Sequence, residues 1–485
     1  MSTSNTPHMQ NFIDGAWCDA RSGKSVKAKS PSTNLILATV TSSDRVDSQN
    51  AIVAAQKGHE ILAKMTNWER SSLCNRVADE MVKRRDLLAQ TLAEEQGKPI
   101  ASEAYPEVDA AIAGFRNAAE MVKWMEGSVI PAETPGKRVI SIRQPRGVYG
   151  IITPWNFPIN IPVEYLAPCL AAGNGVVWVP SPSTAICAAR LMECIVAAGL
   201  PDGAINLVLG PGQSAGDEVV SNPGTHGIGL TGSPQTGKIV AQRGAGKPML
   251  LELGGNGPLI VLDDADVAKA ADAAAFGFYF NAGQVCAATG RVLVTRKNYD
   301  EVAERITAYA NNLVVNDPLA NSTTMGPLHN AGGILKTTQH IEDALTKGAD
   351  LLSGGKLLAG QKSDLFFAPT VLGNVSEDAL INIDETFGPV APIVVYEDEA
   401  GLLQAANSAS QGLATSVYTQ NLAKAFQFGE GLQSGLVNIN SPTCYWELHI
   451  PFGGAAGKDS GVGRIGGISM LNEVTQVKTI TFDIT

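Results

Sequence analysis

The chain has 485 residues, of which 36 are Lys or Arg and 47 are Asp or Glu, so its formal net charge is -11. An acidic chain without a basic cluster repels phosphate groups, which argues against binding to nucleic acid or to anionic membranes. Hydrophobic residues make up 44% of the chain, enough to support a packed core. The length corresponds to roughly three domains' worth of chain.

The first 145 residues combine helical and extended patterns. Residues 48–63 and 69–96 carry apolar residues at helical spacing, and residues 137–144 alternate at the period of a strand. Further on, five short apolar runs are separated by helix-like stretches, which is typical of buried parallel strands with helical crossovers. These runs are 150–152, 175–178, 205–209, 227–230 and 259–262.

A second α/β stretch follows from residue 266 to about residue 440. Residues 474–483 then alternate like an edge strand, and its expected partner is segment 139–142 or another subunit. Residues 165–189 have no charged side chain and could span a bilayer by length. Repeated Pro and Gly residues interrupt this run, so we interpret it as buried backbone with turns.

Residues 1–10 are polar and lack the apolar stretch of a signal peptide. The seven cysteines are widely spaced without a C-x-x-C pair, which favours reduced thiols over disulfides or a zinc site. The six histidines are scattered as well. We therefore expect a cytoplasmic location and no metal site.

Two motifs point to other classes of enzyme. Residues 232–238 have the spacing of a P-loop, but Ile239 stands where a Ser or Thr must reach the magnesium ion. Residues 212–216 match the G-x-S-x-G nucleophile elbow of serine hydrolases, with Ser214 as the nucleophile. No His is identified as its partner, and a match of this length arises by chance in a Gly-rich chain. Both remain weak alternatives.

Three segments carry a stronger pattern. Residues 150–158 form an apolar run that ends in a turn with two prolines, and residues 251–256 place Glu252 inside an apolar run that breaks on two glycines. Residues 280–286 place Cys286 behind a small, polar turn. A buried carboxylate needs a partner or a chemical role, whereas a lone Cys is more often an inert core residue.

Together these segments resemble the signature motifs of the aldehyde dehydrogenase superfamily, from residue 12 to the final strand. Further matches are Gly232–Ser233 with Gly237, residues 385–389 and residues 451–454. The resemblance implies an α/β fold with a Rossmann-like cofactor domain, an α/β catalytic domain and a small β oligomerisation extension. The implied bounds are 1–126 and 146–254 for the cofactor domain, 255–440 for the catalytic domain, 127–145 and 468–485 for the extension, and 441–467 for a substrate-tunnel loop that returns to the cofactor domain.

The family oxidises aldehydes with a nicotinamide dinucleotide. The resemblance implies that Cys286 is the nucleophile, that Asn156 and the Cys286 backbone N–H hold the oxyanion, and that Glu252 activates the hydrolytic water. It also implies a small-molecule aldehyde as substrate and assembly as a homodimer or homotetramer. The implied cofactor contacts are Ile152, Thr153, Pro154, Trp155, Val179, Gly212, Gly232, Ser233, Leu253, Glu385 and Phe387.

Two departures from the family pattern bear on the cofactor. Val179 stands where a Lys usually bonds the adenine ribose, and Pro182 stands where NAD-preferring members often carry a Glu. We expect NAD, because no basic residue replaces the lost Lys, and NADP stays open.

Other departures bear on the substrate. Glu164 replaces the Arg that succinic semialdehyde dehydrogenases present to the substrate carboxylate, and Tyr165 replaces a common Lys. One interpretation of segment 440–450 is a packed loop near the subunit interface. In the family, however, this segment lines the substrate tunnel, and here it is rich in Tyr, Trp, Glu and His. These residues favour a small polar aldehyde that is hydroxylated, sugar-derived or a semialdehyde, and the alternative is a cationic aminoaldehyde. The expected substrate contacts are Asn156, Glu164, Tyr165, Cys286, Tyr445, Trp446 and Phe452, with Glu447 and His449 as further tunnel residues.

Overall fold

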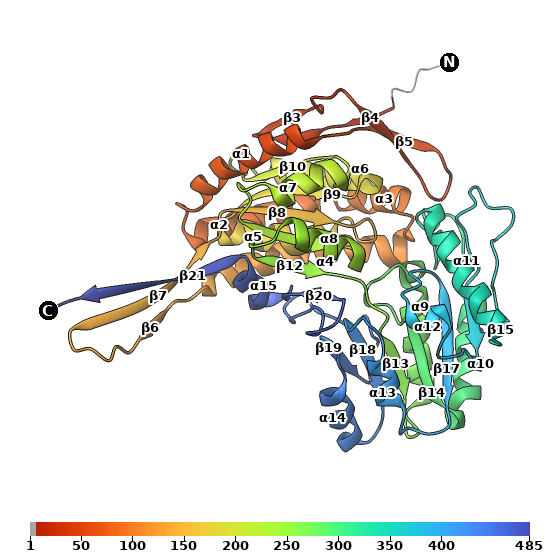
Figure 1. The fold of residues 1–485 in the computed structure, drawn as a ribbon. Coiled ribbons are helices and arrows are strands. Elements are labelled where there is room, and N and C mark those ends of the chain that lie inside the picture. Colours follow the sequence, from red (N-terminus) through yellow and green to blue (C-terminus); the bar gives the residue numbers. More distant parts are fainter. Residues whose placement is uncertain (1–5) are drawn as a thin grey trace, which may run out of the picture.

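The computed structural model describes residues 6–485, so the first five residues of the polar N-terminal segment lie outside it. The chain forms two large sheets flanked by helices and two three-stranded sheets. Figure 1 shows the two large units one above the other, with one small sheet projecting to the side. This architecture confirms the predicted α/β class.

The first large sheet has the strand order β20-β12-β11-β8-β9-β10-β2-β3, and its five strands from β12 to β10 run parallel. From β8 the chain continues to β9 and β10 on one side, and then returns to place β11 and β12 on the other side of β8. Such a switch in direction, here between β8 and β11, leaves a crevice at the carboxyl ends of the two strands. The strands are β2 (Asn11–Ile13), β3 (Ala16–Cys18), β8 (Val148–Thr153), β9 (Gly175–Pro180), β10 (Ile205–Leu207), β11 (Gly227–Thr231), β12 (Met249–Glu252) and β20 (Gly461–Val462).

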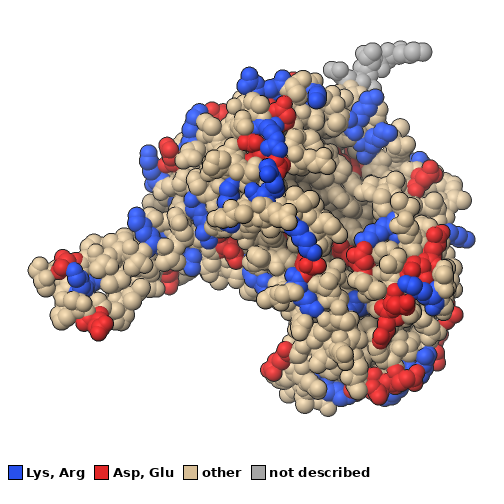
Figure 2. All heavy atoms as spheres, viewed as in Figure 1, with Lys and Arg blue, Asp and Glu red and all other residues tan. Residues whose placement is uncertain are grey.

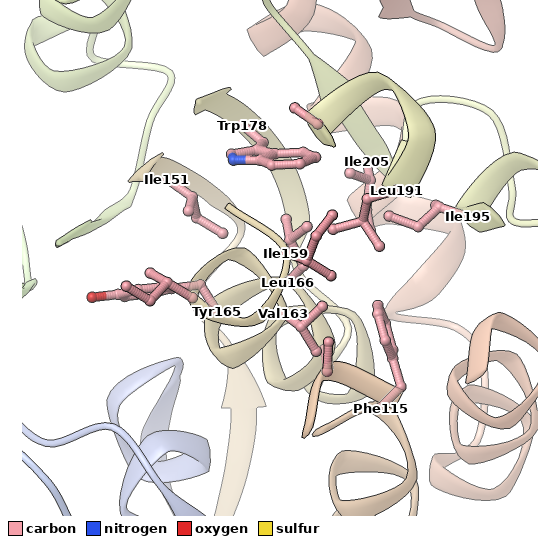
Figure 3. Packing of buried hydrophobic residues seen from close by; sticks show 14 of the residues in the cluster. Phe115, Ile151, Ile159, Val163, Tyr165, Leu166, Trp178, Leu191, Ile195 and Ile205 are labelled. Atoms are coloured by element: carbon pink, nitrogen blue, oxygen red, sulfur yellow. The ribbon is translucent and has the colours of Figure 1, made fainter. Parts of the chain in front are cut away.

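Helices cover both faces of this sheet. The predicted helical segment 69–96 is two helices, because the backbone of Arg84 leaves the helical conformation between them. Figure 3 shows part of the core on one face, where Trp178 and Ile151 from the sheet pack against Leu166 and Phe115. The helices are α1 (Arg45–Leu62), α2 (Asn67–Lys83), α3 (Arg85–Glu95), α4 (Tyr105–Met121), α5 (Asn160–Ala172), α6 (Ala185–Ala197), α7 (Asp217–Ser221), α8 (Pro234–Arg243) and α15 (Gly467–Glu473).

The uncharged run 165–189 forms most of α5, strand β9 and the start of α6, and nearly all of it is buried. Gly173 ends α5 with a φ of 95°, a conformation that glycine adopts without strain. The structure thus confirms buried backbone with turns. No helix within residues 6–485 is long and apolar enough to cross a membrane.

The second large sheet has the strand order β15-β16-β17-β14-β13-β18-β19, in which only β15 runs antiparallel to its neighbour. The strands are β13 (Pro258–Val261), β14 (Arg291–Thr295), β15 (Asp350–Ser353), β16 (Thr370–Gly373), β17 (Val390–Tyr396), β18 (Ala414–Tyr418) and β19 (Leu436–Ile439). Its helices are α9 (Val267–Tyr279), α10 (Arg296–Asn312), α11 (Ala331–Thr346), α12 (Leu380–Ile383), α13 (Leu402–Asn407) and α14 (Leu422–Gly431).

The projecting sheet consists of β6 (Ser128–Ile130), β7 (Lys137–Pro145) and β21 (Thr475–Asp483). The predicted partner of the final strand is confirmed, since β21 pairs with β7 in antiparallel register over its whole length. Figure 2 shows this sheet as largely uncharged, with a few charged groups near its tip. The other small sheet, β1 (His8–Met9), β5 (Ile36–Thr41) and β4 (Ser25–Lys29), was not predicted.

Candidate active site

Cys286 follows a tight turn at the end of α9. Three successive residues, Asn281, Ala282 and Gly283, have φ values of 50°, 53° and 74°, so the backbone turns through the left-handed region. Gly283 is required there, because a Cβ atom on it would lie 2.2 Å from the carbonyl oxygen of Gly388. The Cys286 side chain, at the end of this turn, is half-buried.

Asn156 connects the corner after β8 to the loop of Cys286. Its Nδ2 donates to the backbone oxygen of Gln284 at 2.9 Å, and Asn281 Nδ2 donates back to the Asn156 backbone oxygen at 3.1 Å. Asn156 is 4% exposed. These reciprocal hydrogen bonds fix its amide beside the cysteine loop.

Glu252 is the last residue of β12 and is buried, and neither of its carboxylate oxygens has a hydrogen-bond partner within the described chain. Burial raises the pKa of Glu252 well above its usual value, Glu164 raises it further, and Arg464 opposes the shift. Burial also raises the pKa of the Cys286 thiol, with contributions from Glu252, Glu385 and Glu164. These acidic groups therefore oppose one another's ionisation.

A cavity of about 160 Å³ adjoins Cys286 and Glu252. Glu164 Oε1 accepts a hydrogen bond from Asn160 Nδ2 at 2.7 Å, and both residues line the cavity. Burial raises the pKa of Glu164 to about 8, which the Asn160 hydrogen bond partly offsets. The lining residues, none of which is Lys or Arg, are Phe157, Asn160, Ile161, Glu164, Thr231, Glu252, Phe280, Val285, Cys286, Ala287, Cys444, Trp446, Phe452 and Ile465.

A larger cavity of about 500 Å³ meets Cys286 and Glu252 from the side of the first sheet. It lies at the carboxyl ends of β8, β9 and β11, the position where open α/β sheets bind dinucleotides. It is lined by Ile152, Thr153, Pro154, Trp155, Asn156, Ser181, Pro182, Leu230, Thr231, Gly232, Ser233, Thr236, Glu252, Leu253, Gly254, Cys286, Glu385 and Phe387.

A third cavity of about 820 Å³ adjoins the second, since Ile152, Pro182 and Thr236 line both. Gly212 lines this third cavity together with Arg45 and Arg243. Ser233, which lines the second cavity, caps helix α8 by accepting a hydrogen bond at 3.2 Å from the N–H of Thr236, which lines both. A helix N-terminus in this place suits an anionic group such as a pyrophosphate.

Glu385 lies across the cavity from the first sheet. Its Oε1 accepts a hydrogen bond from the Gly255 N–H at 3.1 Å, and burial raises its pKa to about 7. Gly254 leaves room for this carboxylate, because a Cβ atom on Gly254 would lie 2.6 Å from Glu385 Oε2. The ring of Phe387 meets that of Trp155 edge-on at 5.6 Å, so the two aromatic residues form one wall.

Comparison with known proteins agrees with this geometry. The model of the aldehyde dehydrogenase family matches residues 17–480. The chain belongs to the aldehyde dehydrogenase family. It is therefore an NAD(P)-dependent enzyme, and the substrates of its family are small aldehydes.

Individual relatives are similar over nearly their whole length. Glutarate-semialdehyde dehydrogenase of Pseudomonas putida is 37% identical, covering 98% of both chains. Succinate-semialdehyde dehydrogenase [NADP(+)] of Escherichia coli is 36% identical, covering 99% of this chain and 98% of the relative. The crystal structure of succinate-semialdehyde dehydrogenase from Burkholderia pseudomallei superposes with a TM-score of 0.96 at 34% identity, covering 100% of both chains.

Most of the predicted site residues lie around these connected cavities, but three lie elsewhere. Val179 faces the core beside α1, because alternate residues of β9 point to opposite faces. Tyr165 is fully buried behind the substrate cavity, where its hydroxyl bonds Thr231 Oγ1 at 2.8 Å. Tyr445 is 46% exposed and donates to Glu447 at 2.7 Å, outside the cavity lining. Glu447 and His449 are likewise exposed.

Sequence reasoning missed several lining residues. Asn160 precedes Glu164 by one helical turn of α5, so the spacing itself places both on one face and could have identified it. Phe157 and Phe280 line the substrate cavity as well. They belong to the motifs of residues 150–158 and 280–286, but the sequence did not assign them to the substrate. Arg45 and Arg243 come from distant segments, and no local pattern connects them with the third cavity.

The residues of the two alternative motifs make ordinary structural contacts. Ser214 Oγ donates to the backbone oxygen of Pro211 at 3.5 Å, and no His is among its hydrogen-bond partners within residues 6–485. Lys238 of the P-loop-like segment forms an exposed ion pair with Asp459 at 3.2 Å. All seven cysteines are free, and the described chain has no cluster of three metal-binding side chains.

Proposed function

We propose that the chain oxidises a small polar aldehyde to its carboxylic acid through a thioester on Cys286. The Cys286 thiolate adds to the aldehyde carbon, and the resulting oxyanion accepts hydrogen bonds from Asn156 Nδ2 and the Cys286 backbone N–H. A bound nicotinamide dinucleotide supplies the acceptor for the hydride that the carbon then loses. Glu252 takes a proton from the water that cleaves the thioester, which releases the acid and regenerates the thiol.

The contacts around Cys286 support these roles. The Asn156 amide is held beside the cysteine loop by its bond to the Gln284 backbone oxygen. Both oxygens of Glu252 are unpartnered within the described chain, so they are free to accept a proton from water. Cys286 and Glu252 line both the substrate cavity and the adjoining cofactor cavity, which suits residues that act on either side of the hydride transfer.

The observation that carries the choice of a polar substrate is the pair Asn160 and Glu164. Asn160 Oδ1 is buried without a hydrogen-bond partner within residues 6–485, so the cavity wall contains an acceptor that the protein itself does not satisfy. With its pKa raised to about 8, Glu164 is mostly protonated at neutral pH and can donate a hydrogen bond. A substrate hydroxyl can use both groups.

The names of the relatives point to aldehydes that carry a carboxylate. The substrate cavity has no Lys or Arg in its lining, so an ion pair with such a carboxylate is not available there. Protonated Glu164 could still donate a hydrogen bond to it. The alternative is a cationic aminoaldehyde, which would ionise Glu164 and lie against the faces of Phe157, Phe280 and Trp446.

Two variants at Glu164, measured beside the wild type, separate these substrates. The panel comprises glyceraldehyde, succinic semialdehyde, 4-aminobutanal and decanal, measured as kcat/KM with the wild type, Glu164→Gln and Glu164→Ala. We expect glyceraldehyde or the semialdehyde to be preferred, with Gln retaining most activity and Ala losing about tenfold. A preference for 4-aminobutanal that Glu164→Gln abolishes would establish the aminoaldehyde alternative. A preference for decanal would contradict both.

Glu447→Gln, which alters an exposed carboxylate outside the cavity, is the matched control.

We also propose that the enzyme acts in the cytoplasm as a homodimer or homotetramer assembled through the projecting sheet. Val129 is 80% exposed and Val477 is 59% exposed on this sheet, which favours burial against another copy. Seven unpaired cysteines suit a reducing compartment. Sedimentation of the wild type and of Val129→Glu tests the assembly, and a monomeric wild type would contradict it.

A further inference from the structure

A chain of three hydrogen-bonded side chains borders the cofactor cavity. Ser181 Oγ lies 3.0 Å from Ser183 Oγ, and Ser183 Oγ lies 2.8 Å from Nε2 of His329. The two serines follow the carboxyl end of β9, whereas His329 comes from a loop of the second large unit, just before α11. The link therefore joins the rim of the cofactor cavity to the half of the molecule that carries Cys286.

The partners of His329 determine the direction of these hydrogen bonds. Nδ1 lies 3.3 Å from the backbone oxygen of Gln96, which can only accept, so Nδ1 carries the proton of the neutral ring. Burial lowers the pKa of His329 to about 4, which keeps the ring neutral at physiological pH. Nε2 must then accept the Ser183 hydroxyl proton, and Ser183 Oγ must accept the proton of Ser181.

This order leaves Ser181 Oγ as an acceptor. Its own proton points to Ser183, and one lone pair accepts the Ser183 backbone N–H at 3.4 Å. One lone pair remains, and Ser181 lines the 500 Å³ cavity while the adjacent Pro182 lines both this cavity and the 820 Å³ cavity. Ser181 thus lies next to the junction of the two cavities.

His329 is held firmly in this orientation. Its ring stacks on Trp155, with the centroids 4.5 Å apart and the planes 10° from parallel. Its backbone N–H donates to Gln284 Oε1 at 2.9 Å. The imidazole is only 8% exposed, so it cannot readily turn to offer a proton to Ser183 instead.

We propose that His329, acting through Ser183, makes Ser181 an acceptor for the 2′-hydroxyl of the adenosine ribose and so selects NAD over NADP. A 2′-hydroxyl donates a hydrogen bond, whereas a 2′-phosphate at neutral pH presents acceptor oxygens that a donor-free Ser181 repels. His329 is a positioning residue in this scheme, since it acts on the ribose only through the two serines.

The two arginines that line the 820 Å³ cavity, Arg45 and Arg243, do not offset this preference. Arg45 pairs with Asp217 and with Glu218, and Arg243 pairs with Asp217 through its Nε at 2.6 Å. Two guanidinium groups on the wall of the 820 Å³ cavity are thus matched by two carboxylates, of which Asp217 also lines the cavity. The cluster is neutral as a whole and provides no uncompensated charge for a 2′-phosphate.

Equilibrium binding of cofactors to the aldehyde-free enzyme tests the proposal. Dissociation constants of NAD⁺, NADP⁺ and 2′-deoxy-NAD⁺ are measured by titration calorimetry for the wild type, His329→Phe and Ser183→Ala. His329→Phe preserves the stack on Trp155 but removes the acceptor nitrogen, and Ser183→Ala removes the link from the other side. Ser376→Ala, which deletes a serine hydroxyl bonded to Asp378 on a loop after β16, is the control.

We expect the wild type to prefer NAD⁺ to NADP⁺ and to bind 2′-deoxy-NAD⁺ about fivefold to tenfold more weakly than NAD⁺, the value of one hydrogen bond. In both variants the preference for NAD⁺ over NADP⁺ falls about tenfold, because the Ser181 hydroxyl is then free to donate its hydrogen bond to the cofactor. Ser376→Ala leaves all three constants unchanged.

A wild type that prefers NADP⁺, or that does not distinguish NAD⁺ from 2′-deoxy-NAD⁺, would overturn the proposal without any variant. Folded variants with an unchanged preference would also overturn it. The inference rests on the dinucleotide site of the proposed function but not on its aldehyde. If the substrate panel contradicts the proposed aldehyde but the variants still show the expected loss of preference for NAD⁺, the proposed substrate is rejected and this proposal stands.

Discussion

Lys98 and Glu107 form an ion pair beneath the active site with side-chain exposures of only 0% and 1%. Lys98 Nζ lies 3.2 Å from the centroid of the Phe157 ring. Glu107 Oε1 accepts hydrogen bonds from the backbone N–H groups of Ile159 at 3.0 Å and Asn160 at 3.2 Å. The pair thus fixes the segment that brings Phe157 and Asn160 to the substrate cavity.

Breaking this pair should destabilise the protein. Glu107→Gln keeps an acceptor for the backbone but leaves the Lys98 charge uncompensated, so we expect a loss of about 3 kcal/mol in the free energy of unfolding. Adding Lys98→Met removes that charge, and the double variant should recover part of the loss. Urea denaturation measures both. A double variant less stable than Glu107→Gln alone would show that the buried charge is not the cause.

Replacing Glu252 by Gln should separate the two halves of the reaction. We expect the variant to form reduced cofactor in a rapid burst of about one equivalent, because thiol addition and hydride loss do not require this base. Steady turnover should fall by about a hundredfold or more, since thioester hydrolysis does require it. Stopped-flow absorbance of the reduced cofactor reports both phases. An equal loss of burst and turnover would assign Glu252 to an earlier step.

The like charges around Cys286 predict the pH dependence of activity. The pKa values of Cys286 and Glu252 are both raised, and both groups must lose a proton to act, so kcat, which includes thioester hydrolysis, should rise with pH through the neutral range. Glu164 raises both pKa values. Glu164 is charged only above its own pKa of about 8, so Glu164→Gln should move the part of the acidic limb above pH 8 to lower pH, by roughly half a unit to one unit. A limb that stays in place or moves to higher pH would exclude this coupling.

Gly254→Ala should impair cofactor binding through Glu385. The added methyl group would lie 2.6 Å from Glu385 Oε2, so the carboxylate must shift. We expect the KM for the cofactor to rise about tenfold, on the order of one displaced charged hydrogen bond. Gly429→Ala is the control, because nothing lies within 4 Å of its Cβ position, and its KM should not change. An unaltered KM in Gly254→Ala would argue against a role for Glu385 at the cofactor.

Two further variants distinguish the dehydrogenase from the hydrolase alternative. Cys286→Ala should abolish aldehyde oxidation, because it removes the thiol that adds to the aldehyde carbon. Ser214→Ala should leave oxidation within about twofold of wild type, since its hydroxyl contacts only the Pro211 backbone oxygen within the described chain. The measurements are aldehyde oxidation and the hydrolysis of a p-nitrophenyl ester. The reverse pattern, with activity lost only in Ser214→Ala, would revive the hydrolase.

The predicted site residues that lie around the cavities belong to short segments whose local chemistry fixes the backbone. Glu252 ends a strand at a pair of glycines, and Cys286 follows a glycine turn, so neighbouring residues position each of them. Val179 lies away from the cavities because its direction depends on which face of β9 packs against α1, which the local sequence does not determine. His329 reaches Trp155 across more than 170 residues of chain, and no spacing rule connects such residues.

The pairing of β7 with β21 joins residues that are at least 330 positions apart. During synthesis, β7 therefore emerges long before its partner and must wait, with one edge unpaired, until almost the whole sequence has been translated. A chain that is cut short before residue 475 leaves this edge open. The surface through which we propose that subunits assemble is thus completed last, so that only chains with both halves of the catalytic machinery already made can join an assembly.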